Sequence, residues 1–257
     1  MIIINADDFG LNTQTNKAII KSFESMLCSS TTLMPNMPGF EEACELAHQH
    51  KLINHVGFHL VLTGGQALTE KIKQHPRFFD DERGQLCLSP GAHCLHLTNA
   101  EKEALAEEIR AQLKRCQDYG IPITHLDSHR HIHTRWAITN VLFPILRKKR
   151  IPYIRLSCNI RGGTSLLKRT YKSIYNTRLK RWGFARTKFF ISIYDYDYFK
   201  EKTKLAYEGE SVEVMVHPMY SDEGQLINLG DKIPLKDRIK AIDSYQNAVS
   251  FSNCRHF

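Results

Sequence analysis

The 257-residue sequence lacks any apolar run close to the roughly 18 residues that a membrane-spanning helix needs. Its first eight residues contain no basic segment, and two carboxylates interrupt the opening apolar stretch too early for a signal peptide. Internal repeats, low-complexity tracts and linkers are absent as well. These absences predict a cytoplasmic protein that does not enter a membrane and that forms a single domain over residues 1–257.

The sequence also lacks a Cys-x-x-Cys pair of the zinc-binding or redox type. Its seven cysteines are odd in number and scattered, so we expect reduced thiols rather than a disulfide framework. With 42% apolar and 24% charged residues, the composition is that of a globular protein and excludes a disordered chain.

Positive charge is in excess, with 35 Lys and Arg against 27 Asp and Glu, and most of it lies between Arg147 and Lys188. From Lys168 to Lys188, basic residues interleave with apolar ones at roughly helical spacing. This pattern predicts an amphipathic helix with a solvated basic face. A basic patch for anionic ligands or partners is the alternative.

Short β-rich segments alternate with helical patterns along most of the chain. Helices are predicted after the first strand, over residues 40–50, from Thr98 with its capping-box partner Glu101 to Gly120, and over 136–149. Strands are predicted at residues 2–5, 56–60, 124–127, 153–156, 189–193 and 212–216. This alternation indicates an α/β fold with a mainly parallel sheet, either a barrel or an open sheet.

Residues 64–97 carry turn signals and no clear periodicity. We expect this segment to be a long excursion over the face on which a barrel usually keeps its active site.

Two adjacent carboxylates, Asp7 and Asp8, directly follow the first strand. They would repel each other unless a cation lies between or beside them. In a regular strand they would point to opposite faces, but Gly10 permits a turn that brings both toward one site. In the alternative interpretation, Asp8 or Asn12 only caps the following helix.

Histidines are the other candidate ligands. His59 stands alone in an apolar strand, where a satisfied core histidine is the alternative. If the segment 125–133 is extended, one of its faces carries four imidazoles and a carboxylate, those of His125, Asp127, His129, His131 and His133. A metal centre explains such a face, because imidazole is a common ligand and a neighbouring carboxylate orients it. A surface pH-sensing or adventitious metal-binding cluster is the alternative.

His217 follows a run of β-branched residues, and Pro218 ends that strand. One carboxylate of the first strand, His59 and one histidine of the 125–133 segment would form a three-ligand metal site with open coordination positions. The spare carboxylate can then act as a base toward water, and His217 as an acid toward a leaving group. This layout predicts a metal-assisted hydrolase.

The segments that carry these residues resemble the YdjC-like carbohydrate deacetylases, the group that includes chitooligosaccharide deacetylase. They are NADDFG at 5–10, GFH at 57–59, THLDSHRHIH at 124–133 and HP at 217–218, and the match runs in order from Ile2 to about Tyr220. The resemblance implies a distorted (β/α) TIM-like barrel. It also implies hydrolysis of N-acetyl groups from short acetylated amino-sugar oligosaccharides of the chitooligosaccharide type, with release of acetate.

Roles follow from the resemblance position by position. It implies that the metal ligands are Asp8, His59 and His129, and that the catalytic groups are Asp7 as base, His217 as acid and Arg155 as holder of the catalytic carboxylate. The family suggests one divalent ion, Mg²⁺, whereas the ligand chemistry suits Zn²⁺. A homodimer is also implied.

Sugar rings stack on aromatic faces, so we expect substrate contacts at Phe9, Trp136 and Tyr220, with packing as the alternative for each. His131 is a further candidate for a substrate contact. Two other functions stay open. One is a metal-dependent hydrolase of another ester, amide or phosphoester, with the basic residues of 168–188 attracting an anionic substrate. The other is a nucleic-acid-binding protein with incidental histidines, which predicts salt-sensitive binding.

Overall fold

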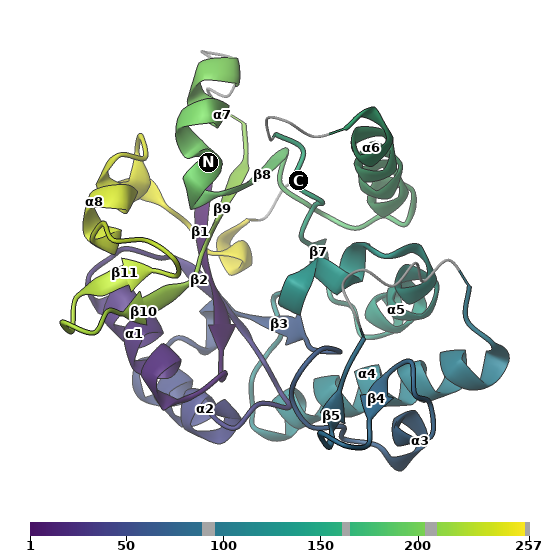
Figure 1. Ribbon diagram of the computed structural model, residues 1–257. Coiled ribbons are helices and arrows are strands. Elements are labelled where there is room, and N and C mark those ends of the chain that lie inside the picture. Colours follow the sequence, from purple (N-terminus) through teal and green to yellow (C-terminus); the bar gives the residue numbers. More distant parts are fainter. Residues whose placement is uncertain (89–95, 161–164, 204–209, 255–257) are drawn as a thin grey trace.

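The computed structural model describes residues 1–88, 96–160, 165–203 and 210–254. A curled, parallel sheet of seven strands runs through the centre of this α/β protein (Figure 1). The strand order is β7-β6-β3-β2-β1-β9-β8. The strands are β1 (Ile2–Phe9), β2 (Ser30–Leu33), β3 (Val56–Leu60), β6 (His125–Ser128), β7 (Tyr153–Ile154), β8 (Phe189–Ser192) and β9 (Val212–Val216).

The expected closed barrel is not confirmed, because β7 and β8 are the two edges of the described sheet. β7 has two residues instead of the predicted four, and one isolated bridge joins its Tyr153 to Ala185, four residues before β8. Beyond this bridge, the side chain of Asn159 donates a hydrogen bond to the Lys188 carbonyl and accepts one from the Phe190 N–H. A side-chain amide therefore connects the two edges where a closed barrel has a strand ladder.

Helices cover the outside of the curled sheet, with α1, α2 and α8 to its left and α4, α5 and α6 to its right in Figure 1. Their bounds are α1 Thr13–Glu24, α2 Phe40–Gln49, α3 Glu70–Lys73, α4 Asn99–Asp118, α5 Trp136–Lys148, α6 Leu166–Arg181, α7 Tyr196–Thr203 and α8 Leu235–Lys240. The capping box of Thr98 and Glu101 is confirmed at the start of α4. Within the described ranges, no helix has the length and apolarity needed to cross a membrane.

The excursion expected at 64–97 packs beside α4. It contains α3 and a short hairpin of β4 (Phe79–Asp80) and β5 (Gln85–Leu86), while residues 89–95 lie outside the described ranges. The buried Glu108 carboxylate of α4 accepts hydrogen bonds from the backbone N–H groups of Leu68 and Thr69. These bonds fix the start of the excursion to the helix layer.

One strand of the seven-stranded sheet, β2, was not predicted from the sequence. Its four residues, Ser-Thr-Thr-Leu, are all buried although three of them are polar. Their hydroxyl groups bond within the protein, as when Thr31 donates to the Ala6 carbonyl of β1. No disulfide joins any two of the six cysteines in the described residues, as expected for reduced thiols, and the seventh, Cys94, lies outside those residues.

Candidate metal centre and active site

The candidate side chains meet at one edge of the sheet. They come from the carboxyl ends of five parallel strands or from the residues that follow, and they are Asp7 and Asp8 of β1, His59 of β3, His129 after β6, Arg155 after β7 and His217 after β9. Because these strands run in the same direction, their ends gather the side chains although they are far apart in sequence. The carboxyl edge of a parallel sheet is where α/β proteins usually bind ligands.

A backbone irregularity brings both carboxylates of β1 to this edge. Asp8 has a left-handed backbone with φ of 71°, and the register between β1 and β2 shifts between Ala6 and Phe9. A non-glycine residue in this region costs of order 1–3 kcal/mol and occurs preferentially at functional sites. The turn that we attributed to Gly10 thus begins at Asp8, and Gly10 continues it with φ of 91°.

The helix-cap interpretation applies to Asn12 and not to Asp8. The Asn12 side chain caps α1 by accepting a hydrogen bond from the Thr15 N–H at 2.9 Å. The carboxylate of Asp8 instead faces two imidazoles.

Asp8, His59 and His129 form a compact group of donor atoms. The Asp8 Oδ1 atom lies 3.1 Å from His59 Nε2 and 3.2 Å from His129 Nδ1, and the three ligand atoms all lie within 4.8 Å of one another. Among the described residues, His59 Nε2 is buried and has no hydrogen-bond partner. An unpartnered buried imidazole nitrogen beside a carboxylate fits a divalent cation, which one carboxylate and two imidazoles can bind.

Asp127 orients His59 for such a role. Its Oδ1 atom lies 2.7 Å from His59 Nδ1, and Thr32 Oγ1 donates to Asp127 Oδ2 at 3.1 Å. With Nδ1 bonded to the carboxylate, Nε2 is left to face Asp8. Burial opposes protonation of His59, but the Asp127 and Asp8 carboxylates outweigh burial and raise its pKa to about 10. The same negative charge would attract a metal cation in place of the proton.

A second group with metal-ligand spacing, Asp7, His59 and Asp127, is already occupied by a guanidinium. Arg155 contacts Asp7 with both terminal nitrogens, and one of these nitrogens also contacts Asp127, each at 2.6 Å. Its Nε donates to Glu213 at 2.6 Å. The first group is therefore the better candidate for a cation.

The carboxylates around Arg155 differ in how readily they ionise. Burial opposes ionisation of Asp7, but Arg155 outweighs burial and holds the pKa of Asp7 well below its usual range. For Glu213, burial is the dominant influence and raises the pKa to about 7. One oxygen of Glu213, Oε2, is buried and has no hydrogen-bond partner in the described part of the chain. Asp7 is thus kept as an anion, whereas Glu213 readily holds a proton.

His217 lies at the solvent side of this group. Its Nε2 atom is 3.9 Å from Asp7 Oδ2, and its backbone N–H donates to Asn228 Oδ1 at 2.7 Å. Asn228 belongs to β11 (Leu226–Asn228), which pairs with β10 (Pro218–Tyr220). The His217 side chain is 28% exposed, so it can contact both Asp7 and a ligand that enters from solvent.

The predicted common face of the 125–133 segment is wrong. β6 ends at Ser128, and the backbones of Arg130 and His131 are left-handed, so the histidines turn in different directions. His133 is buried and bonds to Ser128 Oγ, whereas His131 is exposed, with its ring 5.8 Å from that of Phe190. His125 is buried against Asn5 and the Phe251 ring. Only His129 of this segment joins the metal group of Asp8 and His59.

The predicted aromatic contacts have different outcomes. Phe9 is fully buried in the apolar core, so the expectation that its ring stacks on a sugar is wrong. Trp136 is 40% exposed, and the Arg178 guanidinium lies 4.2 Å from its ring centre. Tyr220 is half-buried in β10. The roles of Trp136, Tyr220 and His131 stay predictions.

Sequence reasoning gave no role to three residues that support the site. Asn5 Nδ2 donates to Asp7 Oδ1 at 2.9 Å, Thr32 bonds to Asp127, and Glu213 binds Arg155. The sequence does contain a signal for a role of Glu213, because this residue is a single carboxylate in an otherwise apolar strand. Thr32 had none, since its strand was not predicted.

Comparison with known proteins gives consistent results. The family model described as YdjC-like protein matches residues 1–249. A carbohydrate deacetylase of Brevibacillus brevis is 34% identical over 229 residues, which are 88% of this chain and 84% of the relative. A carbohydrate deacetylase of Clostridium beijerinckii is 29% identical and covers 98% of this chain and 94% of its own.

A solved structure has a similar fold. It is a candidate cellobiose-phosphate cleavage protein of Enterococcus faecalis V583, with a TM-score of 0.61 and 23% identity over 86% of this chain and 82% of the other. At this identity the likeness concerns the fold. The match of the family model over nearly the whole sequence shows that this chain belongs to the YdjC-like protein family.

Proposed function

We propose that this chain is a metal-dependent hydrolase that removes N-acetyl groups from short acetylated amino-sugar oligosaccharides and releases acetate. The observation that carries the proposal is the juxtaposition of a three-ligand group, Asp8, His59 and His129, with an ionised carboxylate and a solvent-accessible imidazole. The names of the curated relatives support a carbohydrate deacetylase.

Asp8, His59 and His129 are the residues that would hold the ion. When bound, a divalent cation polarises an acetamide carbonyl and lowers the pKa of water. Carboxylate and imidazole together suit Zn²⁺ by ligand chemistry, while Mg²⁺ is the ion implied by the family resemblance.

Asp7 is proposed as the general base. Arg155 keeps it ionised and holds both of its oxygens, so the carboxylate is ready at neutral pH and fixed in direction. The same contacts lower the proton affinity of the Asp7 carboxylate. Because Arg155 also contacts Asp127 and Glu213, its charge is shared among three carboxylates, and this sharing limits the loss of proton affinity at Asp7. Asp7 would accept a proton from water as the water oxygen attacks the acetyl carbon.

His217 is proposed as the general acid. An amine leaves poorly as an anion, so the departing nitrogen needs a proton when the carbon–nitrogen bond breaks. His217 lies 3.9 Å from Asp7 and is accessible from solvent, where the leaving group would stand. Acetate and a free amino sugar result.

The first test is acetate release from N,N′-diacetylchitobiose and N,N′,N″-triacetylchitotriose by chelator-treated protein, with and without Mg²⁺, Zn²⁺, Mn²⁺ or Co²⁺. We expect acetate only when one of these ions is added. His129→Ala removes a proposed metal ligand and should lose bound metal and activity together. His50→Ala, which changes a histidine at the end of α2, is the matched control and should keep both. No acetate from folded protein with any of the ions would reject the proposed substrate and favour another ester, amide or phosphoester.

A further inference from the structure

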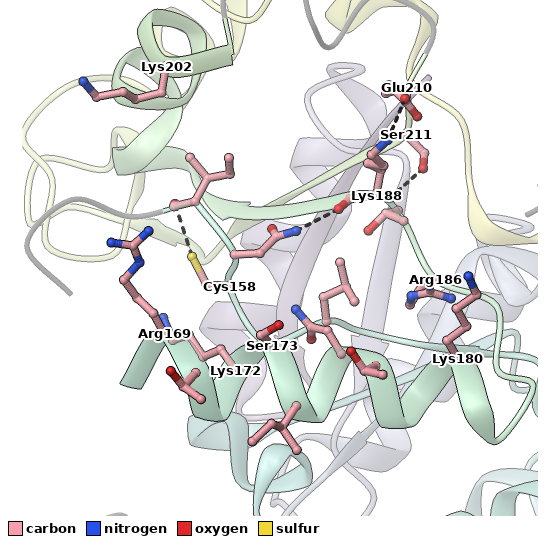
Figure 2. A pocket seen from close by; sticks show the side chains of 18 of the residues that line it. Cys158, Arg169, Lys172, Ser173, Lys180, Arg186, Lys188, Lys202, Glu210 and Ser211 are labelled. Atoms are coloured by element: carbon pink, nitrogen blue, oxygen red, sulfur yellow. Dashed lines mark hydrogen bonds and ion pairs between the residues drawn. The ribbon is translucent and has the colours of Figure 1, made fainter. Parts of the chain in front are cut away.

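A second hollow lies between α6 and the β7–β8 end of the sheet and shares no residue with the site of Asp8 and His59. Its volume is about 1150 Å³. Figure 2 shows α6 as one wall, with Arg169, Lys172, Ser173 and Lys180 along it. The opposite wall is formed by residues 156, 158–160, 186–188, 198, 202 and 210–211. We call this hollow the α6 cleft.

The charge of the α6 cleft is strongly unbalanced. Among the described residues, its lining contains one carboxylate, Glu210, and six cationic side chains, those of Arg169, Lys172, Lys180, Arg186, Lys188 and Lys202. Glu210 pairs with Lys188 at 2.8 Å. Within the described residues, Arg169, Lys172, Lys180 and Arg186 have no ion-pair partner. Facing cations repel each other across the cleft, and an anion between them would relieve that repulsion.

The spacing of these cations selects ligands with more than one anionic group. Arg169 and Lys180 are eleven positions apart on α6, which is about 16 Å along the helix axis. Cations spread over this length favour a ligand that carries more than one anionic group. The helix has no acidic residue and no side-chain cap at Ser165, so its N-terminal N–H groups add partial positive charge at the Arg169 end.

The neutral part of the lining favours phosphate groups over a nucleic-acid strand. Of the described residues that line the cleft, Tyr198 alone is aromatic, and the Lys202 ammonium lies 5.6 Å from its ring centre. The described lining therefore offers no series of aromatic rings on which bases could stack. Arg169 and Arg186 can each bind phosphate oxygens in a bidentate manner, and the hydroxyl-bearing residues Thr170, Ser173, Thr177, Thr187 and Ser211 also line the cleft.

We propose that the α6 cleft binds a small ligand that carries two or more phosphate groups, at a site separate from the deacetylase site. The inference goes beyond the proposed hydrolysis and does not depend on it. A sugar bisphosphate, a nucleotide and an inorganic polyphosphate share this chemistry.

Isothermal titration calorimetry at low ionic strength tests the proposal with inorganic tripolyphosphate as the probe. Orthophosphate, a hexose bisphosphate, ATP and a twelve-residue oligothymidylate are the comparison ligands. We expect tripolyphosphate to bind more tightly than orthophosphate, and the ranking of the other two small ligands identifies the source of the phosphates. Tighter binding of oligothymidylate than of tripolyphosphate would overturn the proposal in favour of a nucleic acid.

Three variants test whether the ligand binds in the α6 cleft. Lys172→Gln/Lys180→Gln should weaken tripolyphosphate binding about tenfold or more, because two charge-assisted contacts are lost. Lys148→Gln/Lys240→Gln removes the same charge from exposed positions on α5 and α8 and should change binding by less than about twofold. Arg186→Gln, on the opposite wall, should weaken binding as well. Equal losses in the first two variants, unchanged binding in Arg186→Gln, or no binding by the unmodified protein would each reject the α6 cleft.

Discussion

The two charged regions of this molecule balance their charges in opposite ways. At the sheet edge, Arg155 is buried among three carboxylates, and each charge has a partner within 2.6 Å. In the α6 cleft, four of the six cations, those of Arg169, Lys172, Lys180 and Arg186, have no ion-pair partner among the described residues, and all six are at least partly exposed. Buried charges must be paired because desolvation is expensive, whereas water and salt screen exposed ones. The first region therefore depends on its internal pairs, and the second is free to pair with a ligand.

The strongest test of this contrast is Arg155→Ala. The change leaves Asp7, Asp127 and Glu213 buried without their cation, and we expect a loss of about 3–5 kcal/mol in the free energy of unfolding. Urea denaturation measures it. Arg169→Ala in the α6 cleft is the control and should change stability by no more than about 0.5 kcal/mol. Equal losses in the two variants would refute the contrast.

A second test separates the residues of the sheet edge by role. Asp7→Asn should retain bound metal while kcat falls by about 10²–10⁴-fold, because the proposed base is lost and the ligands are kept. His129→Ala should lose metal and activity together, since it removes a proposed ligand. Metal analysis and acetate release on the same samples distinguish the two results. An active Asp7→Asn enzyme would exclude Asp7 as the base.

The pH dependence of the free energy of unfolding also distinguishes the sheet edge from the α6 cleft. Burial raises the pKa of Glu213 to about 7 from an ordinary value of 4.5, so the folded state binds this proton more tightly than the unfolded state. The resulting stabilisation is complete below about pH 4.5 and is lost as pH rises toward 7, with a slope of at most about 1.4 kcal/mol per pH unit.

Urea denaturation between pH 5 and pH 7 checks this dependence. Burial lowers the pKa values of His125 and His133, so these two groups make stability rise with pH over the same range. Glu213→Gln removes only the opposing contribution of Glu213, because the amide does not titrate and can still accept from Arg155, and stability should therefore rise more steeply with pH in the variant than in the unmodified protein. Glu210→Gln in the α6 cleft is the control and should leave the slope unchanged. If Glu213→Gln has the same slope as the unmodified protein, Glu213 does not contribute to it.

The smallest expected effect is the change in the free energy of unfolding of Lys172→Gln/Lys180→Gln. Because both side chains lie at the surface of α6 and have no partner in the described ranges, the free energy of unfolding should change by no more than about 0.5 kcal/mol. A loss well above 1 kcal/mol would mean that these cations support the fold and do not form a free binding surface.

Much of this architecture was predictable because it depends on local patterns. The capping box at Thr98 lies within a few residues of its partner Glu101, and six of the seven strands of the sheet showed β-rich sequence. β2 was missed because its polar threonines are satisfied only by neighbours that come from elsewhere in the chain. The closed barrel was expected from the resemblance, and the short β7 leaves the described sheet open.

For the site, the sequence alone determined that carboxylates and imidazoles are available for metal binding and proton transfer, because adjacent carboxylates and clustered histidines after strands can be recognised from the order of residue types. The tertiary structure decided which of them meet. The left-handed backbone of Asp8 aims two neighbouring carboxylates at one site, and the turn at Arg130 and His131 sends one histidine to it and the others away. The pairing of Arg155 with Glu213 joins residues that are 58 positions apart in the sequence. Such contacts depend on three-dimensional proximity and on burial, which local sequence patterns do not contain.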